Sequence, residues 1–117
     1  MADIDDLKQF RPVIDLNAEL VRHPEATFYG RVAGDSLSDA GLHDGDVLVI
    51  DRSLEPSDGS LVVCFADGEF RAGYMSVRRD GVWLVPAAGD RGAVRLDGEG
   101  RVPVWGVVTY VIKNVSP

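Results

Sequence analysis

The stretch that decides the fold is GRVAGDSLSDAGLHDGDVLVIDR, residues 30–52. It predicts a strand that ends before Gly34, a turn through Asp35 and Ser36, one helical turn, and a return to a strand at Val47. Ser36 is therefore expected to lie at the end of a strand, where backbone N–H groups can line an oxyanion site. A serine in such a turn is more often a turn former or a helix N-cap than a nucleophile, so the motif alone does not establish catalysis.

Outward from this stretch, the chain consists of short β-branched and aromatic runs separated by turn signals, which predicts a mostly β domain. The Asp67-Gly68 and Asp80-Gly81 pairs suit type I′ hairpin turns, whose two central residues both need positive φ. The last run is apolar on both faces, so it is expected to be covered on both sides or to lie in a homodimer interface. The runs are TFYGRVA, DVLVID, SLVVCFA, EFRAGYMSV, VWLVPA and PVWGVVTYVIK.

Upstream of the first strand, the sequence predicts one short helix. Leu16 and Leu20 have helix-like spacing, and Asp15 or Asn17 is able to cap the first turn. Residues 1–12 are polar and lack a period, which favours a mobile arm. A chain of 117 residues fits one domain, expected over residues 13–117.

The composition of the chain limits the classes of function that it can have. Hydrophobic residues make up 45% of the chain and charged residues 26%, as in an ordinary globular domain. No apolar run approaches the roughly 20 residues of a membrane span, and no secretory signal is evident, so we expect a cytoplasmic protein without a membrane partner. The net charge of −7 argues against strong direct DNA binding, which needs a basic surface.

The sequence predicts no metal and no cofactor. Cys64 is the only cysteine, lies in an apolar run and is interpreted as a small buried hydrophobe. A group of aspartates suggests calcium, but its spacing does not match an EF-hand loop, and solvated acids and turn formers explain it better. These residues are Asp35, Asp39, Asp44, Asp46 and Asp51.

Residues 14–70 resemble the UmuD branch of the LexA-like self-cleaving proteins. The resemblance rests on Gly-Asp-Ser at Ser36, Asp-Gly-Glu-Phe ending at Phe70, and the elements Asp-Leu-Asn (15–17) and His-Pro-x-Ala-Thr (23–27). The runs VWLVPA (82–87) and VWGVVTYVIK (104–113) continue it. The resemblance implies a signal-peptidase-like twisted β domain of short antiparallel strands with one N-terminal helix.

The same resemblance implies a serine–lysine dyad in which Ser36 is the nucleophile. Leu37 replaces the family's methionine, which is a conservative change. The family's base lysine falls three residues after Phe70, where this chain has Gly73. A serine without an adjacent base is a poor nucleophile, so Ser36 is expected to be vestigial and self-cleavage lost.

Substitutes for the missing base are few. The guanidinium of Arg71 stays charged and cannot accept the serine proton. Lys8 lies in the arm and Lys113 in the closing strand, so neither is well placed. A rebuilt Ser-His-Asp set that uses His23 or His43 with a neighbouring aspartate is a minor alternative.

Taken with the resemblance, these residues predict a processed UmuD-type subunit. No Cys-Gly or Ala-Gly bond of the kind the family cleaves precedes Val13. The implied role is a homodimer that binds a UmuC-like Y-family polymerase in SOS translesion synthesis, with a recombinase filament as a further partner. Candidate contact surfaces are the arm (1–12) and the closing strand (104–113), the latter because an unpaired strand edge can add a partner strand.

Two rival functions stay open. One is an active serine autoprotease or peptidase with an unrecognised base. The other is the regulatory domain of a repressor without its DNA-binding half.

Overall fold

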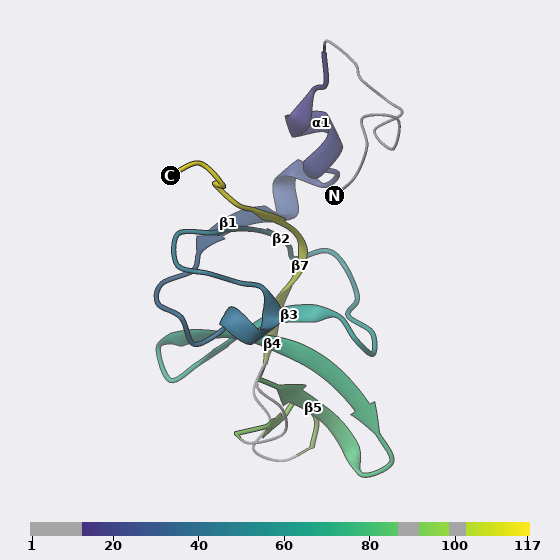
Figure 1. Ribbon diagram of the computed structural model, residues 1–117. Helices are drawn as coiled ribbons and strands as arrows, with labels where there is room; N and C mark the ends of the chain where they lie inside the picture. The colour runs from purple at the N-terminus through teal and green to yellow at the C-terminus, as the bar shows by residue number, and fades with distance from the viewer. Residues whose placement is uncertain (1–12, 87–91, 99–102) are drawn as a thin grey trace, which may run out of the picture.

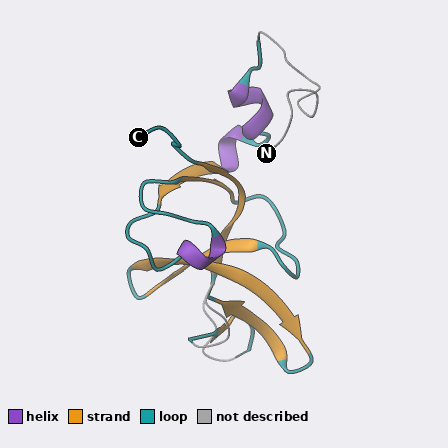
Figure 2. Cartoon of the chain, viewed as in Figure 1, coloured by secondary structure: helices purple, strands orange, loops and turns teal. Residues whose placement is uncertain are grey.

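The computed structural model describes residues 13–86, 92–98 and 103–117, so the predicted arm (1–12) lies outside the described residues. The described chain is mainly β, as the sequence predicts (Figures 1 and 2). Its helical segments are one short α-helix and two 3₁₀ turns: α1 (Leu16–Leu20), η2 (Pro24–Ala26) and η3 (Ser38–Ala40). Its strands are β1 (Thr27–Arg31), β2 (Val47–Asp51), β3 (Leu61–Ala66), β4 (Glu69–Arg78), β5 (Gly81–Val85), β6 (Val94–Arg95) and β7 (Val104–Ile112).

The strands form one antiparallel sheet with the order β1-β2-β7-β3-β4-β5-β6. The last strand in the chain, β7, therefore lies between β2 and β3 and pairs with both. The expectation of an unpaired edge on the closing strand holds only in part, because β3 pairs with β7 over Val104–Val107 and β2 pairs with it over Val107–Ile112. The edge strands of the described sheet are β1 and β6.

One of the two predicted Asp-Gly turns is confirmed. Asp67 and Gly68 join β3 to β4 with φ of 54° and 77°, as a type I′ turn requires. The β4–β5 hairpin turns instead through Arg79 and Asp80, and Gly81 is already the first residue of β5. A Cβ on Gly81 would lie 2.4 Å from a guanidinium nitrogen of Arg95, so the glycine makes room for that side chain.

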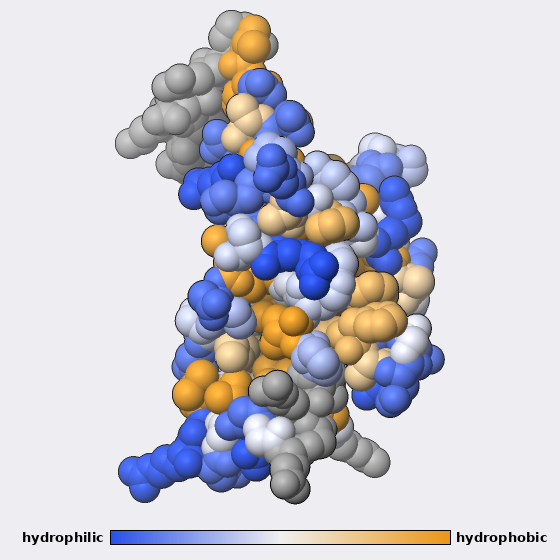
Figure 3. All heavy atoms as spheres, turned by 180° about the vertical axis from the view of Figure 1, so that it is seen from behind, coloured by the Kyte–Doolittle hydropathy of each residue, from blue (hydrophilic) through white to orange (hydrophobic). Residues whose placement is uncertain are grey.

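The N-terminal segment contacts the sheet mainly through its end. Asp15 caps α1 by accepting a hydrogen bond from the Ala18 N–H at 3.2 Å, which resolves the choice of cap. No residue of α1 is buried. Val13 and Ile14 just before it are 80% and 60% exposed, and orange side chains mark this end of the described chain at the top of Figure 3.

The core consists of two buried clusters. The first joins β2 and β3 to the segment between β1 and β2: Val32, Leu42, Leu48, Ile50 and Val63. The second joins β3 to β5: Val62, Cys64 and Leu84. Because β7 residues pack on both clusters, the closing strand ties the two halves of the core together.

Two glycines face Ile50 at different distances and give a matched test of this packing. A Cβ on Gly106 of β7 would lie 2.5 Å from Ile50 Cγ2, whereas one on Gly30 of β1 would meet Ile50 Cδ1 at 3.4 Å. We expect Gly106→Ala to lower the free energy of unfolding by about 1–3 kcal/mol through overpacking, and Gly30→Ala to change it by less than about 1 kcal/mol. Urea denaturation measures both, and equal losses would contradict this account of the core.

Candidate functional site

Ser36 lies in the segment of residues 33–46, here called the Ser36 loop, which joins β1 to β2. The strand, turn, helical turn and return at Val47 are confirmed. The base of the loop is closed by backbone hydrogen bonds, from Val32 N–H to Asp46 O and from Gly45 N–H to Val32 O, both 2.8 Å. This closure holds Ser36 out from the sheet as an exposed residue.

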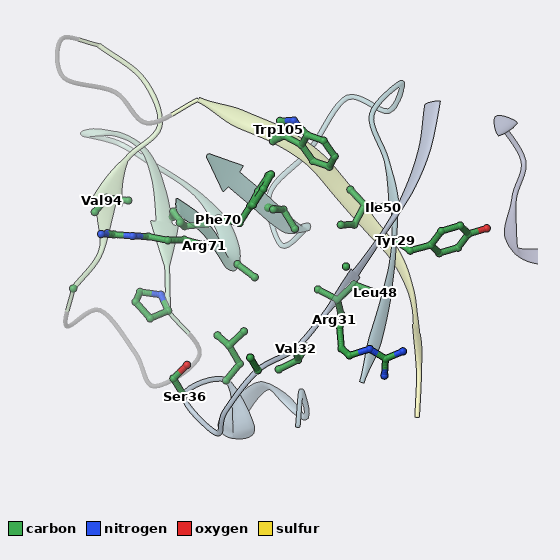
Figure 4. A pocket seen from close by; sticks show the side chains of 18 residues that line it. Tyr29, Arg31, Val32, Ser36, Leu48, Ile50, Phe70, Arg71, Val94 and Trp105 are labelled. Atoms are coloured by element: carbon green, nitrogen blue, oxygen red, sulfur yellow. The ribbon is translucent and has the colours of Figure 1, made fainter. Parts of the chain in front are cut away.

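An apolar groove of about 620 Å³ lies beside the loop (Figure 4). Ser36 forms part of one wall with Val32, and Phe70 and Trp105 belong to another part of the lining. The remaining described lining residues come from β1, β2, β3, β4, β5 and the segment around β6. They are Tyr29, Gly30, Arg31, Ala33, Leu37, Leu48, Ile50, Val63, Arg71, Ala72, Leu84, Pro86, Gly92 and Val94.

No lysine, histidine, aspartate or glutamate occurs among the described residues that line this groove. Its cations are Arg31 and Arg71, which remain charged and cannot serve as bases. Arg31 donates to Gly45 O at 2.8 Å, and Figure 4 shows its side chain and that of Tyr29 directed away from the groove centre. The groove therefore offers Ser36 no base from the described chain.

Gly73 is buried in β4 opposite Val62 of β3. A Cβ built on Gly73 would lie 2.8 Å from Val85 O and 3.0 Å from Leu84 Cδ1. The side chain of Leu84 is buried and also lines the groove. The space that a longer side chain at position 73 needs is thus taken by Leu84 and by the β5 backbone.

Two backbone N–H groups near Ser36 are already engaged. The Gly34 N–H donates to Asp44 Oδ1 at 2.8 Å, and the Ser38 N–H donates to Asp35 O at 3.1 Å. Neither is available to an oxyanion without rearrangement of the loop. The expected oxyanion site is therefore not formed by these two groups.

The structure does not bring either histidine to the groove. His23 Nδ1 contacts Asp51 Oδ2 at 2.5 Å, and Ser53 donates to Asp51 Oδ1 through its N–H and its hydroxyl. Burial pushes the pKa of Asp51 up, but the hydrogen bonds from Ser53 and His23 outweigh it and leave the pKa below its ordinary value. This pair joins the end of the N-terminal segment to β2, away from Ser36.

His43 belongs to a second polar cluster at the base of the Ser36 loop. Lys113 Nζ lies 2.5 Å from Asp46 Oδ2 and 2.9 Å from His43 Nδ1. The His43 N–H also donates to Asp46 Oδ2 at 2.9 Å. The hydrogen bond from Lys113 and then that from His43 hold the pKa of Asp46 below its ordinary value, although burial opposes them. Lys113 is committed to a carboxylate and is not a base for Ser36.

Cys64 is fully buried, as expected, and burial raises the pKa of its thiol to about 11. Within residues 13–86, 92–98 and 103–117, no three or more His, Cys, Asp or Glu side chains are arranged to hold a metal ion. No helix in the described part of the chain is long and apolar enough to cross a membrane.

Sequence reasoning did not find Leu84 or the partners of Asp46. Leu84 occurs in an ordinary β5 pattern, and only the pairing of β4 with β5 places it over Gly73. Asp46 and Lys113 are 67 positions apart, so no local spacing connects them. The chain has only two lysines, Lys8 and Lys113, and the sequence analysis considered Lys113 only as a base for Ser36.

Comparison with known proteins agrees with this geometry. The Peptidase S24-like family matches residues 2–109 of the chain. MucA of Salmonella typhimurium is 42% identical over 98 residues, which are 83% of this chain and 66% of that protein. ImpA of Shigella flexneri is 36% identical over 99 residues, 85% of this chain and 67% of that protein.

The LexA repressor of Aeromonas hydrophila is more distant, with 29% identity over 95 residues, 80% of this chain and 46% of that protein. The chain spans about two thirds of the length of MucA and of ImpA. The fold, the Gly-Asp-Ser loop beside an apolar groove and these similarities lead to one conclusion: the chain belongs to the peptidase S24-like, LexA/UmuD family, as a UmuD-like member.

Proposed function

We propose that this chain is the non-cleaving, UmuD-type accessory subunit of an error-prone translesion polymerase and binds a UmuC-like polymerase subunit in the cytoplasm. The observation that carries the proposal is a groove whose described lining holds Ser36 but no side chain that can act as its base. Such a site has the shape of a peptidase site but lacks the group that would activate the serine, so we infer that the domain acts by binding a partner. The similarity to MucA and ImpA supports the UmuD-type assignment.

The loss of cleavage has a direct test, in which an arm peptide with an Ala-Gly bond is supplied at alkaline pH. We expect wild type to leave the peptide whole over days by intact mass. A lysine at position 73 needs room, so the variant designed to restore a base is Gly73→Lys with Leu84→Ala. Since a general base contributes about 10²–10⁴-fold, this double variant is expected to cut at least about 100-fold faster than wild type.

The matched control adds Ser36→Ala to the double variant and should abolish the gain. Circular dichroism checks that each variant is folded. This check is needed because the Cβ of a lysine at position 73 would also lie close to the Val85 carbonyl oxygen. A fluorophosphonate probe on wild type gives an independent readout that needs no new side chain. Labelling of wild type that disappears in Ser36→Ala would overturn the proposal and favour an active serine peptidase.

For the homodimer, the structure offers a row of aromatic side chains across four strands, here called the aromatic row: Phe28, Trp105, Phe70 and Phe65. Neighbouring ring centroids are 5.1, 5.2 and 4.7 Å apart in that order. The three phenylalanines are 41–59% exposed although they are large and apolar. Exposed aromatic clusters are enriched at subunit interfaces.

A second copy of the chain is the occupant that we assign to the aromatic row. A two-fold axis brings the same patch of both subunits together, so four aromatic rings on each side can be buried at once. The row includes Trp105 of β7, the strand whose sequence predicted an interface. The guanidinium of Arg52 lies over the Trp105 ring, 4.4 Å from its centroid.

We expect Phe70→Glu to convert a dimer into a monomer, because it places two like charges inside the contact. The control is Val77→Glu, which changes another exposed apolar residue of the same strand outside the aromatic row and should remain dimeric. Sedimentation velocity at several concentrations measures both. A monomeric wild type, or dimeric Phe70→Glu, would rule this interface out.

The polymerase partner is tested by co-expression with a UmuC-like polymerase of the same genome and affinity capture through this chain. We expect the polymerase to co-purify with wild type and equally with Ser36→Ala, since binding does not need the hydroxyl. Capture of a DNA-binding protein without any polymerase would contradict the proposal. That outcome would identify the chain as the regulatory domain of a repressor.

A further inference from the structure

The end of β7 is joined to the Ser36 loop by one charged contact. Lys113, the residue after β7, reaches Asp46 Oδ2 and His43 Nδ1, and both acceptors belong to the base of the loop. Asp46 is 3% exposed, while the Lys113 side chain is 38% exposed. A buried carboxylate needs a cation and hydrogen bonds to stay charged, and Lys113 supplies the cation.

The contact with His43 depends on where the protons are. The ammonium group of Lys113 has only hydrogens to offer, so Nδ1 of His43 must accept. Nδ1 can accept only while it carries no proton. A proton on Nδ1 would remove the acceptor and place two cations at a separation of 2.9 Å.

Other charged groups face this cluster and bear on the outcome. Asp44 is on the same loop, and its Oδ1 accepts from the Gly34 N–H. Arg31 reaches the loop from β1 through the Gly45 carbonyl. Asp46 contacts both Lys113 and His43.

We propose that Lys113, His43 and Asp46 form a proton-sensitive clamp that holds the Ser36 loop to the end of β7 and loosens when Nδ1 of His43 is protonated. Histidine is the side chain that ordinarily changes charge between pH 5 and 8. Residues of the Ser36 loop line the groove. A change in pH, or a displacement of the end of β7, would therefore change the shape of the groove through the clamp. This regulation goes beyond binding of a polymerase and holds for the isolated chain.

Amide hydrogen exchange of the full chain, followed by NMR from pH 8 to pH 5.5, tests the clamp. The reporters are the loop-closing N–H groups of Val32, Gly45 and Asp46. The reference groups are the Gly59 and Met75 N–H, whose hydrogen bonds lie in the β4 region. After correction for intrinsic rates, we expect protection of the reporters to fall about fivefold on acidification, while the references do not change.

Two variants decide whether His43 and Lys113 are responsible. His43→Gln keeps a side-chain acceptor but does not titrate, so its loop should stay protected at pH 5.5. Lys113→Met should expose the loop at both pH values, and Lys113→Arg should restore protection at pH 8. Equal pH responses of wild type and His43→Gln would overturn the proposal, as would a Lys113→Met loop that stays protected.

Discussion

The pairing of β7 with both β2 and β3 is the constraint on which the rest of the structure depends. The chain folds into two local units, the β1–β2 pair with the Ser36 loop and the β3–β4–β5 hairpins, and neither pairs directly with the other. β7 supplies the hydrogen bonds between them and packs on both core clusters. The groove lies where the two units meet, since its lining comes from both. Its shape is therefore a product of long-range pairing.

Local features were predictable from the sequence because they rest on local physics. The strand, turn and 3₁₀ turn around Ser36 follow from glycine and aspartate placement, and the helix cap at Asp15 follows from its side chain. The Asp80-Gly81 turn was misplaced by one residue, because Gly81 already pairs with Arg78 in the ladder; its φ of 142° and its lack of a Cβ, which leaves space for the Arg95 guanidinium, account for the glycine there. β6, with two residues, carries too short a pattern to be recognised.

The candidate site was only partly readable. Ser36 and Gly73 could be picked out through the family resemblance, but their surroundings could not. Which side chain fills the space at Gly73, and which carboxylate holds Lys113, depends on strands that meet only in the folded chain. The aspartates around Ser36 were expected to be solvated acids and turn formers. Asp44 does accept a hydrogen bond within the loop, but Asp46 is buried and is paired with Lys113.

The central place of β7 also bears on how the protein is made. Synthesis delivers β1 to β6 before the strand that joins them, so the nascent chain has to keep β2 and β3 with open edges until β7 has emerged from the ribosome. Open edges can pair with neighbouring chains. Addition of β7 therefore completes the sheet, and the period before β7 emerges is when β2 and β3 are most exposed to pairing with wrong partners.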